Sequence, residues 1–256
     1  MTGTKSGHEI CTGPILPHPH LRFREAELIL YGQPMTKAAA VSQQAPGASP
    51  ELSPGQGLDV HPESGLANVQ DRLLDAALAC FRRLGGRRSR IEDIAAEAGI
   101  ARTAVYRYYP NKRAIVAALA TRWLARDETR LAEIARDTGR SPAARLQAFL
   151  MTDAECTRRY LSDGSLGEVL EEVLEHQPAI LLQHRNNVRR HLTGLLAEGS
   201  AAGVFRGDPA EKMSLSIDDL MSRFHDARLA AGIDKAVWRD RAAAAVDMIL
   251  RTVRAR

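Results

Sequence analysis

The stretch IEDIAAEAGIARTAVYRYYPNK, residues 91–112, decides the fold of this chain. It predicts two short helices, one from Ile91 to Ala98 and one from Ala101 or Arg102 to Tyr108, separated by a glycine turn. Small apolar residues on the first helix let the second pack closely against it. A helix pair of this kind places its second helix in the major groove of DNA, while the first lies across the backbone. The sequence therefore predicts a helix-turn-helix that binds double-stranded DNA.

A third helix precedes this pair. Apolar residues at four-residue spacing predict it from Val69 to Leu84, and the glycines at 85 and 86 end it. Ser89 and Glu92, three residues apart, match a capping box at the start of the next helix. Residues 67–116 are therefore expected to form a three-helix DNA-binding domain.

The charge of the chain supports a polyanion-binding role for this domain. Residues 67–116 contain ten Lys and Arg against five Asp and Glu, a net charge of +5. The 66 residues before them have a net charge of −2, with four basic and six acidic side chains, and the remainder is +1, which gives the total of +4. The excess positive charge is thus confined to the predicted helix-turn-helix, as expected of a surface that binds nucleic acid.

The residues expected to contact DNA gather on the second helix of the pair and on its flanks. Arg102, Thr103 and Arg107 are predicted to face outward, and tyrosine hydroxyls, including that of Tyr109, can donate to phosphate. Lys112 and the capped end of the following helix add a phosphate site. The basic loop before the helix pair carries Arg87, Arg88 and Arg90. It is either a solvated loop or a contact with the DNA backbone. The predicted DNA-binding residues are Ser89, Arg90, Arg102, Thr103, Tyr106, Arg107, Tyr108 and Lys112.

Residues 91–100 and 105–112, with Leu74-Asp75-Ala76-Ala77 and Phe81 before them, resemble the DNA-binding signature of TetR-family transcriptional regulators. This resemblance implies a homodimer that binds a palindromic operator, an effector pocket in each C-terminal domain, and a four-helix interface built from the last two helices of both chains. It also implies phosphate contacts for Tyr106, Tyr108 and Lys112. Ala101 departs from the pattern because many members have Ser or Thr there as a helix cap, and a missing cap costs about 1 kcal/mol.

The rest of the chain also shows helical patterns. A helix is expected to follow its cap Asn111 through Trp123 toward Asp137, and another to begin at Pro142 after its cap Ser141. Four further helices are expected, over 166–176, 178–201, from the cap Asp208 to 231, and from 235, after its cap Asp234, to 253. The expected fold is all-α with about nine helices, in which residues 117–256 form an effector-binding and dimerisation domain.

Residues 1–66 are expected to be a disordered N-terminal extension. They are rich in Pro, Gly, Ser, Gln and His, and only residues 21–31 could form a short helix. Such a composition cannot bury enough apolar surface to offset the entropy of the chain. Met35 is an alternative translation start, which would remove residues 1–34.

Candidate effector-binding residues are the large side chains of the C-terminal domain, although apolar residues at helical spacing also form ordinary core. They are Trp123, Phe149, Tyr160, Met221 and Phe224. His184 and His191 share a helix face and could hold a metal together with nearby carboxylates, but surface positions are the simpler interpretation, so no metal is expected. Asp218-Asp219 and Arg223 lie within one helical turn, and an intrahelical ion pair is expected there, with a polar anchor at the effector pocket as the alternative.

Several functional classes are excluded or disfavoured. The motifs GxSxG, HExxH, GxGxxG after a strand and the P-loop are missing, so neither an enzyme nor a bound cofactor is expected. Three widely spaced cysteines, no secretory signal and no long apolar run favour a cytoplasmic protein without membrane contact. The leading interpretation is a repressor released by a small molecule. The alternative is a constitutive or architectural DNA-binding protein, or an activator, without an effector pocket.

Overall fold

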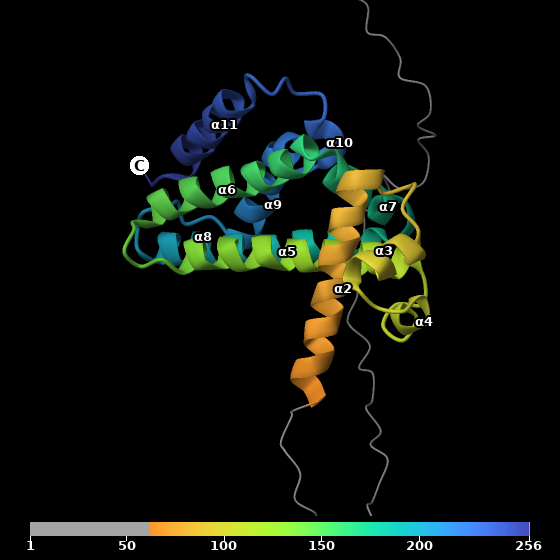
Figure 1. Cartoon of the computed structure of the whole chain (residues 1–256). Helices are drawn as coiled ribbons and strands as arrows, with labels where there is room; N and C mark the ends of the chain where they lie inside the picture. The colour runs from red at the N-terminus through yellow and green to blue at the C-terminus, as the bar shows by residue number, and fades with distance from the viewer. Residues whose placement is uncertain (1–61, 256) are drawn as a thin grey trace, which may run out of the picture. The chain divides into compact units, whose positions relative to one another are not determined.

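The computed structural model describes residues 62–255, and these residues fold into helices joined by short loops (Figure 1). The helices are α2 (Pro62–Leu84), α3 (Ile91–Ala98), α4 (Arg102–Val105), α5 (Lys112–Arg136), α6 (Pro142–Ser162), α7 (Gly164–His176), α8 (Pro178–Ala201), α9 (Ala210–His225), α10 (Ala227–Ala230) and α11 (Trp238–Val253). No strand occurs within this range, and a single antiparallel bridge joins Phe205 to Arg254. The all-α prediction is confirmed. The expectations for residues 1–61, including the short helix and the alternative start, lie outside the described residues.

Three helix starts follow their predicted signals. Asn111 Oδ1 accepts a hydrogen bond from the Ala114 amide at the start of α5 (2.9 Å). Ser141 Oγ accepts from the Ala144 amide at the start of α6 (3.3 Å). Pro178 is the first residue of α8, where its missing N–H costs nothing. These predictions are confirmed.

Two boundaries near the helix-turn-helix differ from the predictions. Helix α2 begins at Pro62 instead of Val69, because proline suits the first turn of a helix. Helix α4 ends at Val105 instead of Tyr108 and continues as turns, in which the Tyr108 amide donates to Val105 O (3.0 Å). Pro110 disfavours the helical conformation in Tyr109, the residue before it, and so ends these turns.

The predicted capping box at Ser89 is wrong. Arg90 occupies the N-cap position of α3, and its backbone amide donates to the carboxylate of Asp93 (2.8 Å). The box is therefore shifted by one residue, and Glu92 is left free to make another contact. The Ser89 side chain turns inward instead of capping α3.

The C-terminal helices also start later or break where a continuous helix was expected. Asp208 does not cap α9, which begins at Ala210 after Pro209. The helix expected to reach residue 231 breaks at Asp226 into α9 and α10. Asp234 stabilises a turn by accepting from the amide two residues on, and α11 then begins at Trp238.

The core consists of two clusters of buried apolar residues. The first joins α2, α3, the single turn α4 and the N-terminal half of α5 to the end of α6 and to α7. Its innermost side chains include Phe81, Ile94, Val105 and Leu119, each fully buried. Because α7 supplies Val169 and its neighbours to this cluster, the helix-turn-helix does not have a core of its own.

The second cluster fills the space between the C-terminal half of α5, most of α6, α8, α9, α10 and α11. In Figure 1, α5, α6 and α8 lie alongside one another, and α11 packs on α6 and α9. Gly199 on α8 permits a close approach, because a Cβ at this position would collide with the buried ring of Phe205. Gly203, with φ of 70°, then turns the chain after α8.

Candidate nucleic-acid interface and effector domain

The turn between α3 and α4 has the geometry that the sequence predicts. Gly99 adopts φ of 66°, a left-handed conformation that glycine reaches without steric cost, and its amide donates to Ala96 O (3.1 Å). The next amide, that of Ile100, donates to Ala95 O (3.0 Å). Val105 anchors α4 in the core with no exposed surface. The opposite side of α4 is exposed to solvent.

The exposed side of α4 carries Arg102, Thr103, Tyr106 and Arg107. Tyr106 is 42% exposed. The guanidinium of Arg102 lies 5.7 Å from the centre of the Tyr106 ring and donates to its hydroxyl (3.2 Å), a contact that raises the pKa of Arg102. The structure thus brings four of the predicted DNA-binding residues onto one surface.

A carboxylate that the sequence analysis assigned to helix capping lies on the same surface. Glu92, in the first turn of α3, pairs with Arg102 at 3.0 Å between Oε1 and Nη1. Both side chains are about half exposed, at 58% for Arg102 and 50% for Glu92. Arg102 therefore lies between the carboxylate of Glu92 and the hydroxyl of Tyr106. Glu92 and Arg102 are ten residues apart and lie on different helices, so no local pattern in the sequence predicts their contact.

The ammonium of Lys112 lies beside the loop that leads into α3 instead of projecting into solvent. It donates to three backbone carbonyls, those of Gly86 (2.6 Å), Arg87 (3.1 Å) and Ser89 (2.9 Å). These bonds occupy all three donors of the ammonium group, and burial lowers the pKa of Lys112. Lys112 thus holds the basic loop in place, a role that the sequence analysis did not predict. Its phosphate contact stays a prediction that requires these bonds to loosen.

Two residues assigned to the DNA surface are buried instead. Ser89 is 2% exposed, and its hydroxyl donates to the carbonyls of Cys80 (3.2 Å) and Gly85 (2.8 Å). It cannot reach a phosphate in this conformation, so its assignment as a direct contact is wrong. Tyr109 is 8% exposed, and burial raises its pKa, so its hydroxyl does not lie at the groove edge. Arg90 is exposed and Tyr108 is half-buried.

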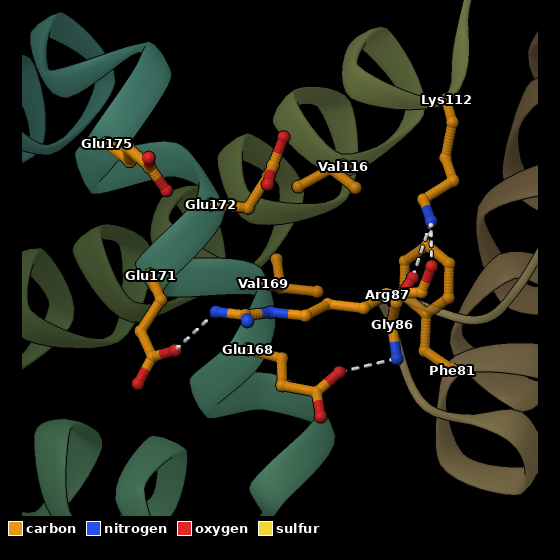
Figure 2. Close-up of a pocket in the computed structure, with 10 residues that line it drawn as sticks. All are labelled: Phe81, Gly86, Arg87, Lys112, Val116, Glu168, Val169, Glu171, Glu172 and Glu175. Atoms are coloured by element: carbon orange, nitrogen blue, oxygen red, sulfur yellow. Dashed lines mark hydrogen bonds and ion pairs between the residues drawn. The ribbon is translucent and has the colours of Figure 1, made fainter. Parts of the chain in front are cut away.

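Helix α7 contacts the loop between α2 and α3 through a series of acidic side chains (Figure 2). Glu168 accepts from the Gly86 amide (2.5 Å), and Glu171 lies 4.0 Å from Arg87. A hollow of about 50 Å³ lies between these residues and Lys112. The contact joins the DNA-binding module, by which we mean α2, α3, α4 and the loops between them, to the C-terminal half of the chain.

Two more ion pairs extend the same contact. Arg82 near the end of α2 pairs with Asp163 at the start of α7 (3.0 Å), and Arg113 on α5 pairs with Glu172 (3.2 Å). All four side chains are partly exposed, so each pair adds at most about 1 kcal/mol. Together with the contacts of Glu168 and Glu171, these pairs hold α7 against the module. No local pattern in the sequence indicated this contact.

The five predicted effector-binding residues do not line one pocket. Trp123 and Tyr160 stack with ring centres 6.3 Å apart in the first core cluster. Phe149, Met221 and Phe224 belong to the second cluster. All five are at most 8% exposed. Of the five, Phe149 and Met221 line the same small cavity, and the effector-binding role of all five stays a prediction.

A buried charged group lies inside the second cluster and connects α6, α8 and α9. Arg185 donates from Nη1 to both carboxylate oxygens of Asp153 (3.1 and 3.0 Å) and from Nη2 to Asp218. His225 lies 3.6 Å from Asp153 and 3.7 Å from Asp218. We call these four residues the buried charge cluster. Asp218 pairs with Arg185, and also with Arg189 at 3.5 Å, so the expected intrahelical pair of Asp218 is wrong.

The buried charge cluster borders a small apolar cavity. The cavity measures about 10 Å³, close to the space that one water molecule needs, and Phe149, Ile217 and Met221 are among its lining residues. The Nε of Arg185 is buried without a hydrogen-bond partner. Burial alone would raise the pKa of Asp153, but Arg185 and His225 outweigh it and hold this pKa well below its usual range. Asp153 lies one helical turn from Phe149, a spacing that could have marked it as a buried carboxylate.

Comparisons with known protein families agree with this geometry. The family model described as "Bacterial regulatory proteins, tetR family" matches residues 73–119, which contain α3 and α4. The model "Tetracyclin repressor-like, C-terminal domain" matches residues 142–246. The chain belongs to the TetR family of transcriptional regulators. It is therefore a transcription regulator with a DNA-binding helix-turn-helix.

Solved structures of other TetR regulators share the fold. A TetR-family regulator from Mesorhizobium loti is 14% identical with a TM-score of 0.59, and the match covers 73% of this chain and 98% of that one. SmeT, the repressor of the Stenotrophomonas maltophilia multidrug efflux pump SmeDEF, is 21% identical with a TM-score of 0.55, and the match covers 72% and 90%. A SmeT–triclosan complex is 20% identical with a TM-score of 0.56, over 73% and 92%. At these identities the similarity shows the fold alone. No curated protein matches the sequence.

The last helices of this TetR regulator carry most of its exposed apolar side chains. Among residues with a described side chain, six large apolar ones are exposed, and five of them lie between 215 and 248. These five are Leu215, Leu220, Leu229, Val237 and Met248, with Met248 exposed to 70%. Large exposed apolar side chains are often found where a protein contacts another protein.

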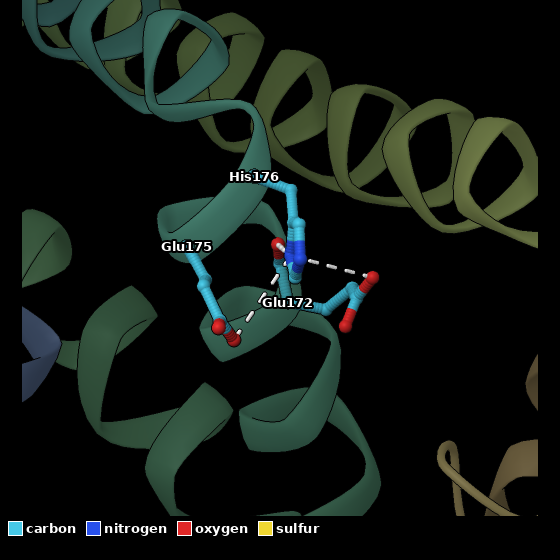
Figure 3. Close-up of side chains that lie close together, drawn as sticks. All are labelled: Glu172, Glu175 and His176. Atoms are coloured by element: carbon cyan, nitrogen blue, oxygen red, sulfur yellow. Dashed lines mark hydrogen bonds and ion pairs between the residues drawn. The ribbon is translucent and has the colours of Figure 1, made fainter.

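Of the two histidines considered as metal ligands, His184 has another partner. His184 on α8 pairs with Glu128 on α5 (2.8 Å). A different group, Glu172, Glu175 and His176, brings three possible ligand atoms within 4.8 Å of one another on α7 (Figure 3). Glu172 already pairs with Arg113, so this exposed group does not by itself indicate a metal site. Within residues 62–255, no helix is both long and apolar enough to cross a membrane.

Proposed function

We propose that this TetR regulator is a repressor that binds a palindromic operator as a homodimer. The observation that carries the proposal is the exposed surface of α4, where Arg102, Thr103, Tyr106 and Arg107 lie together above a fully buried Val105. A short helix presented in this way fits the major groove, and the side chains on its outer face reach base edges. Arg90 and Tyr108 flank this surface and are proposed to contact phosphates.

The homodimer is proposed to form through α9 and α11. Leu215 and Leu220 on α9 and Met248 on α11 are half or more exposed in the single chain, although they could be covered by a second copy. Two recognition helices must lie one DNA turn apart, roughly 34–36 Å, to bind adjacent half-sites. A Leu220→Glu variant tests the interface. It should be monomeric by light scattering, whereas Glu133→Gln on the exposed side of α5 should remain dimeric.

DNA binding is tested by fluorescence anisotropy with the full chain and DNA from upstream of its own gene. We expect salt-sensitive, sequence-selective binding, because the net charge of +5 lies on the DNA-binding module. Arg107→Ala should weaken binding and lower the slope of log K against log salt by about 1 if Arg107 contacts a phosphate. Arg130→Ala, an exposed arginine in the middle of α5, is the matched control and should leave both quantities unchanged. Binding to all duplexes with equal affinity would contradict the proposal.

A small-molecule effector is proposed to enter the apolar cavity beside the buried charge cluster. Ligand sites are mostly apolar with a few convergent polar groups, and this cavity combines Phe149 and Met221 with Arg185 and Asp218. Binding would have to move these side chains, since the cavity is far smaller than the ~300 Å³ usual for a ligand. Such a movement would shift α9 and thereby the spacing of the recognition helices.

The small size of the cavity also favours a second candidate, a DNA-binding protein that needs no effector. A thermal-shift screen followed by anisotropy separates the two. The effector model expects a compound that raises the melting temperature and lowers operator affinity in the same concentration range. If compounds stabilise the protein without any change in DNA affinity, the effector-free candidate is preferred. TetR regulators are generally not enzymes, and we propose no catalytic activity.

A further inference from the structure

The contact between Glu92 and Arg102 has a consequence for how DNA sequence is read. Arg102 is the first residue of α4, and both of its terminal nitrogens are engaged. Nη1 pairs with Glu92 at 3.0 Å, and Nη2 donates to the Tyr106 hydroxyl at 3.2 Å. These partners come from α3 and α4, so they restrict the guanidinium in two directions. A free arginine at this position would instead sample many rotamers.

The two contacts leave the guanidinium able to bind DNA. Arginine has five N–H donors in a planar fork, and one bond from each terminal nitrogen leaves three of them. A fork with its orientation fixed can donate to both O6 and N7 of guanine, the commonest specific contact in the major groove. The carboxylate would thus hold Arg102 in a direction that suits one base.

The charge of Glu92 has a second effect. Glu92 is half exposed beside the residues that face DNA, so its carboxylate repels phosphates and neutralises Arg102 wherever no guanine is available. Non-specific binding depends almost wholly on phosphate contacts. Glu92 therefore weakens binding to random DNA more than binding to the correct site, which is how repulsive contacts produce specificity.

We infer that Glu92 is a specificity-determining positioning residue, which orients Arg102 toward a guanine in the operator and suppresses binding to other DNA. This inference rests on the proposed DNA-binding function of α4. It does not depend on the effector or on the dimer interface.

The test uses the full chain and a library of random duplexes, from which bound sequences are selected and read. The wild-type protein should enrich a site with a guanine that Arg102→Ala no longer selects. Glu92→Gln should reduce the preference for this guanine by about tenfold, within the range expected for losing part of a bidentate contact. It should also tighten binding to a scrambled duplex and steepen the salt slope by about 1.

Two further variants separate positioning from charge and folding. Glu92→Asp keeps the charge but is too short to hold Arg102 in the same place, so it should lose the guanine preference without tightening binding to scrambled DNA. Glu97→Gln removes the same charge at the other end of α3, where Glu97 pairs with Arg83 (2.9 Å), and should retain the preference. Melting temperatures of all variants check that each one is folded.

The outcomes are distinct. If Glu92→Gln and Glu97→Gln change the guanine preference equally, or if Glu92→Gln still changes it in the Arg102→Ala background, the inference is overturned. If the wild-type protein enriches no sequence, the proposed function fails first, and the inference fails with it.

Discussion

Replacing Asp153 by Asn should destabilise the protein strongly because it removes one of the two carboxylates that balance Arg185. Asp153 is 5% exposed and accepts two hydrogen bonds from Arg185, at 3.0 and 3.1 Å. Removing one partner of a buried ion pair costs about 3–5 kcal/mol, and Asp218 alone would then have to balance Arg185. For a chain of this size, about 2–4 °C of melting temperature corresponds to 1 kcal/mol. The expected fall is therefore roughly 6–20 °C.

The same ion pair predicts how stability depends on pH. The pKa of Asp153 is lowered in the folded protein, so its ionised form contributes stability at every pH above the unfolded value, about 3.9. This contribution is lost as the pH falls below that value toward the folded pKa. The wild type should thus lose stability as the pH falls below about 4, and Asp153→Asn should lose less stability over the same pH range.

Thermal and urea unfolding followed by circular dichroism, at a fixed protein concentration, measure both effects. Glu133→Gln on the exposed side of α5 is the control that removes one negative charge without a buried partner. Arg185→Met combined with Asp153→Asn should be less destabilised than the sum of the single variants, because neither leaves the other unpaired. Equal stability of Asp153→Asn and Glu133→Gln would refute the proposed importance of the buried charge cluster.

Three further predictions concern single positions. Ala101→Ser should supply the missing cap of α4, where no side chain now caps the helix, and tighten operator binding about fivefold, as 1 kcal/mol implies; unchanged or weaker binding in anisotropy would mean that α4 does not start there. Gly199→Ala should lower stability by about 1–3 kcal/mol because its Cβ collides with Phe205, and Phe205→Leu should restore part of the loss in urea unfolding. Cys156 should resist alkylation at pH 8 in the native protein, because burial, followed by the nearby Asp127, raises its pKa to about 12; peptide mass spectrometry that finds rapid native labelling would contradict this burial.

The helix order and the recognition surface could be predicted from the sequence because both depend on local signals. Glycine at 99, the cap at Asn111 and proline at 142 act within a few residues, and the helix end and the two helix starts that they mark are confirmed. With Val105 in the core, Arg102, Thr103 and Arg107 are predicted to face outward, and all three are exposed.

The contacts between helices could not be predicted in this way. Lys112 was expected at a phosphate but bonds to carbonyls 23 to 26 residues away, a distance in sequence at which no periodic pattern operates. Phe149 and Trp123 were grouped because they are large and apolar, yet packing places them in different clusters. Trp123 lies in the N-terminal half of α5 and Phe149 in the first half of α6, and only the tertiary structure fixes which cluster each half joins.

The attachment of α7 to the DNA-binding module limits how regulators of this kind can exchange parts. The apolar residues of α7 complete the first core cluster, and Glu168 bonds to the loop before α3. A hybrid protein joined near residue 119 would place a foreign α7 against α2, with an unmatched apolar surface and an unbonded Gly86 amide. Recombination should therefore succeed only when α7 is inherited together with residues 62–119 or is redesigned to fit them. In this sense α4 and α7 belong to one structural unit, which must be exchanged as a whole.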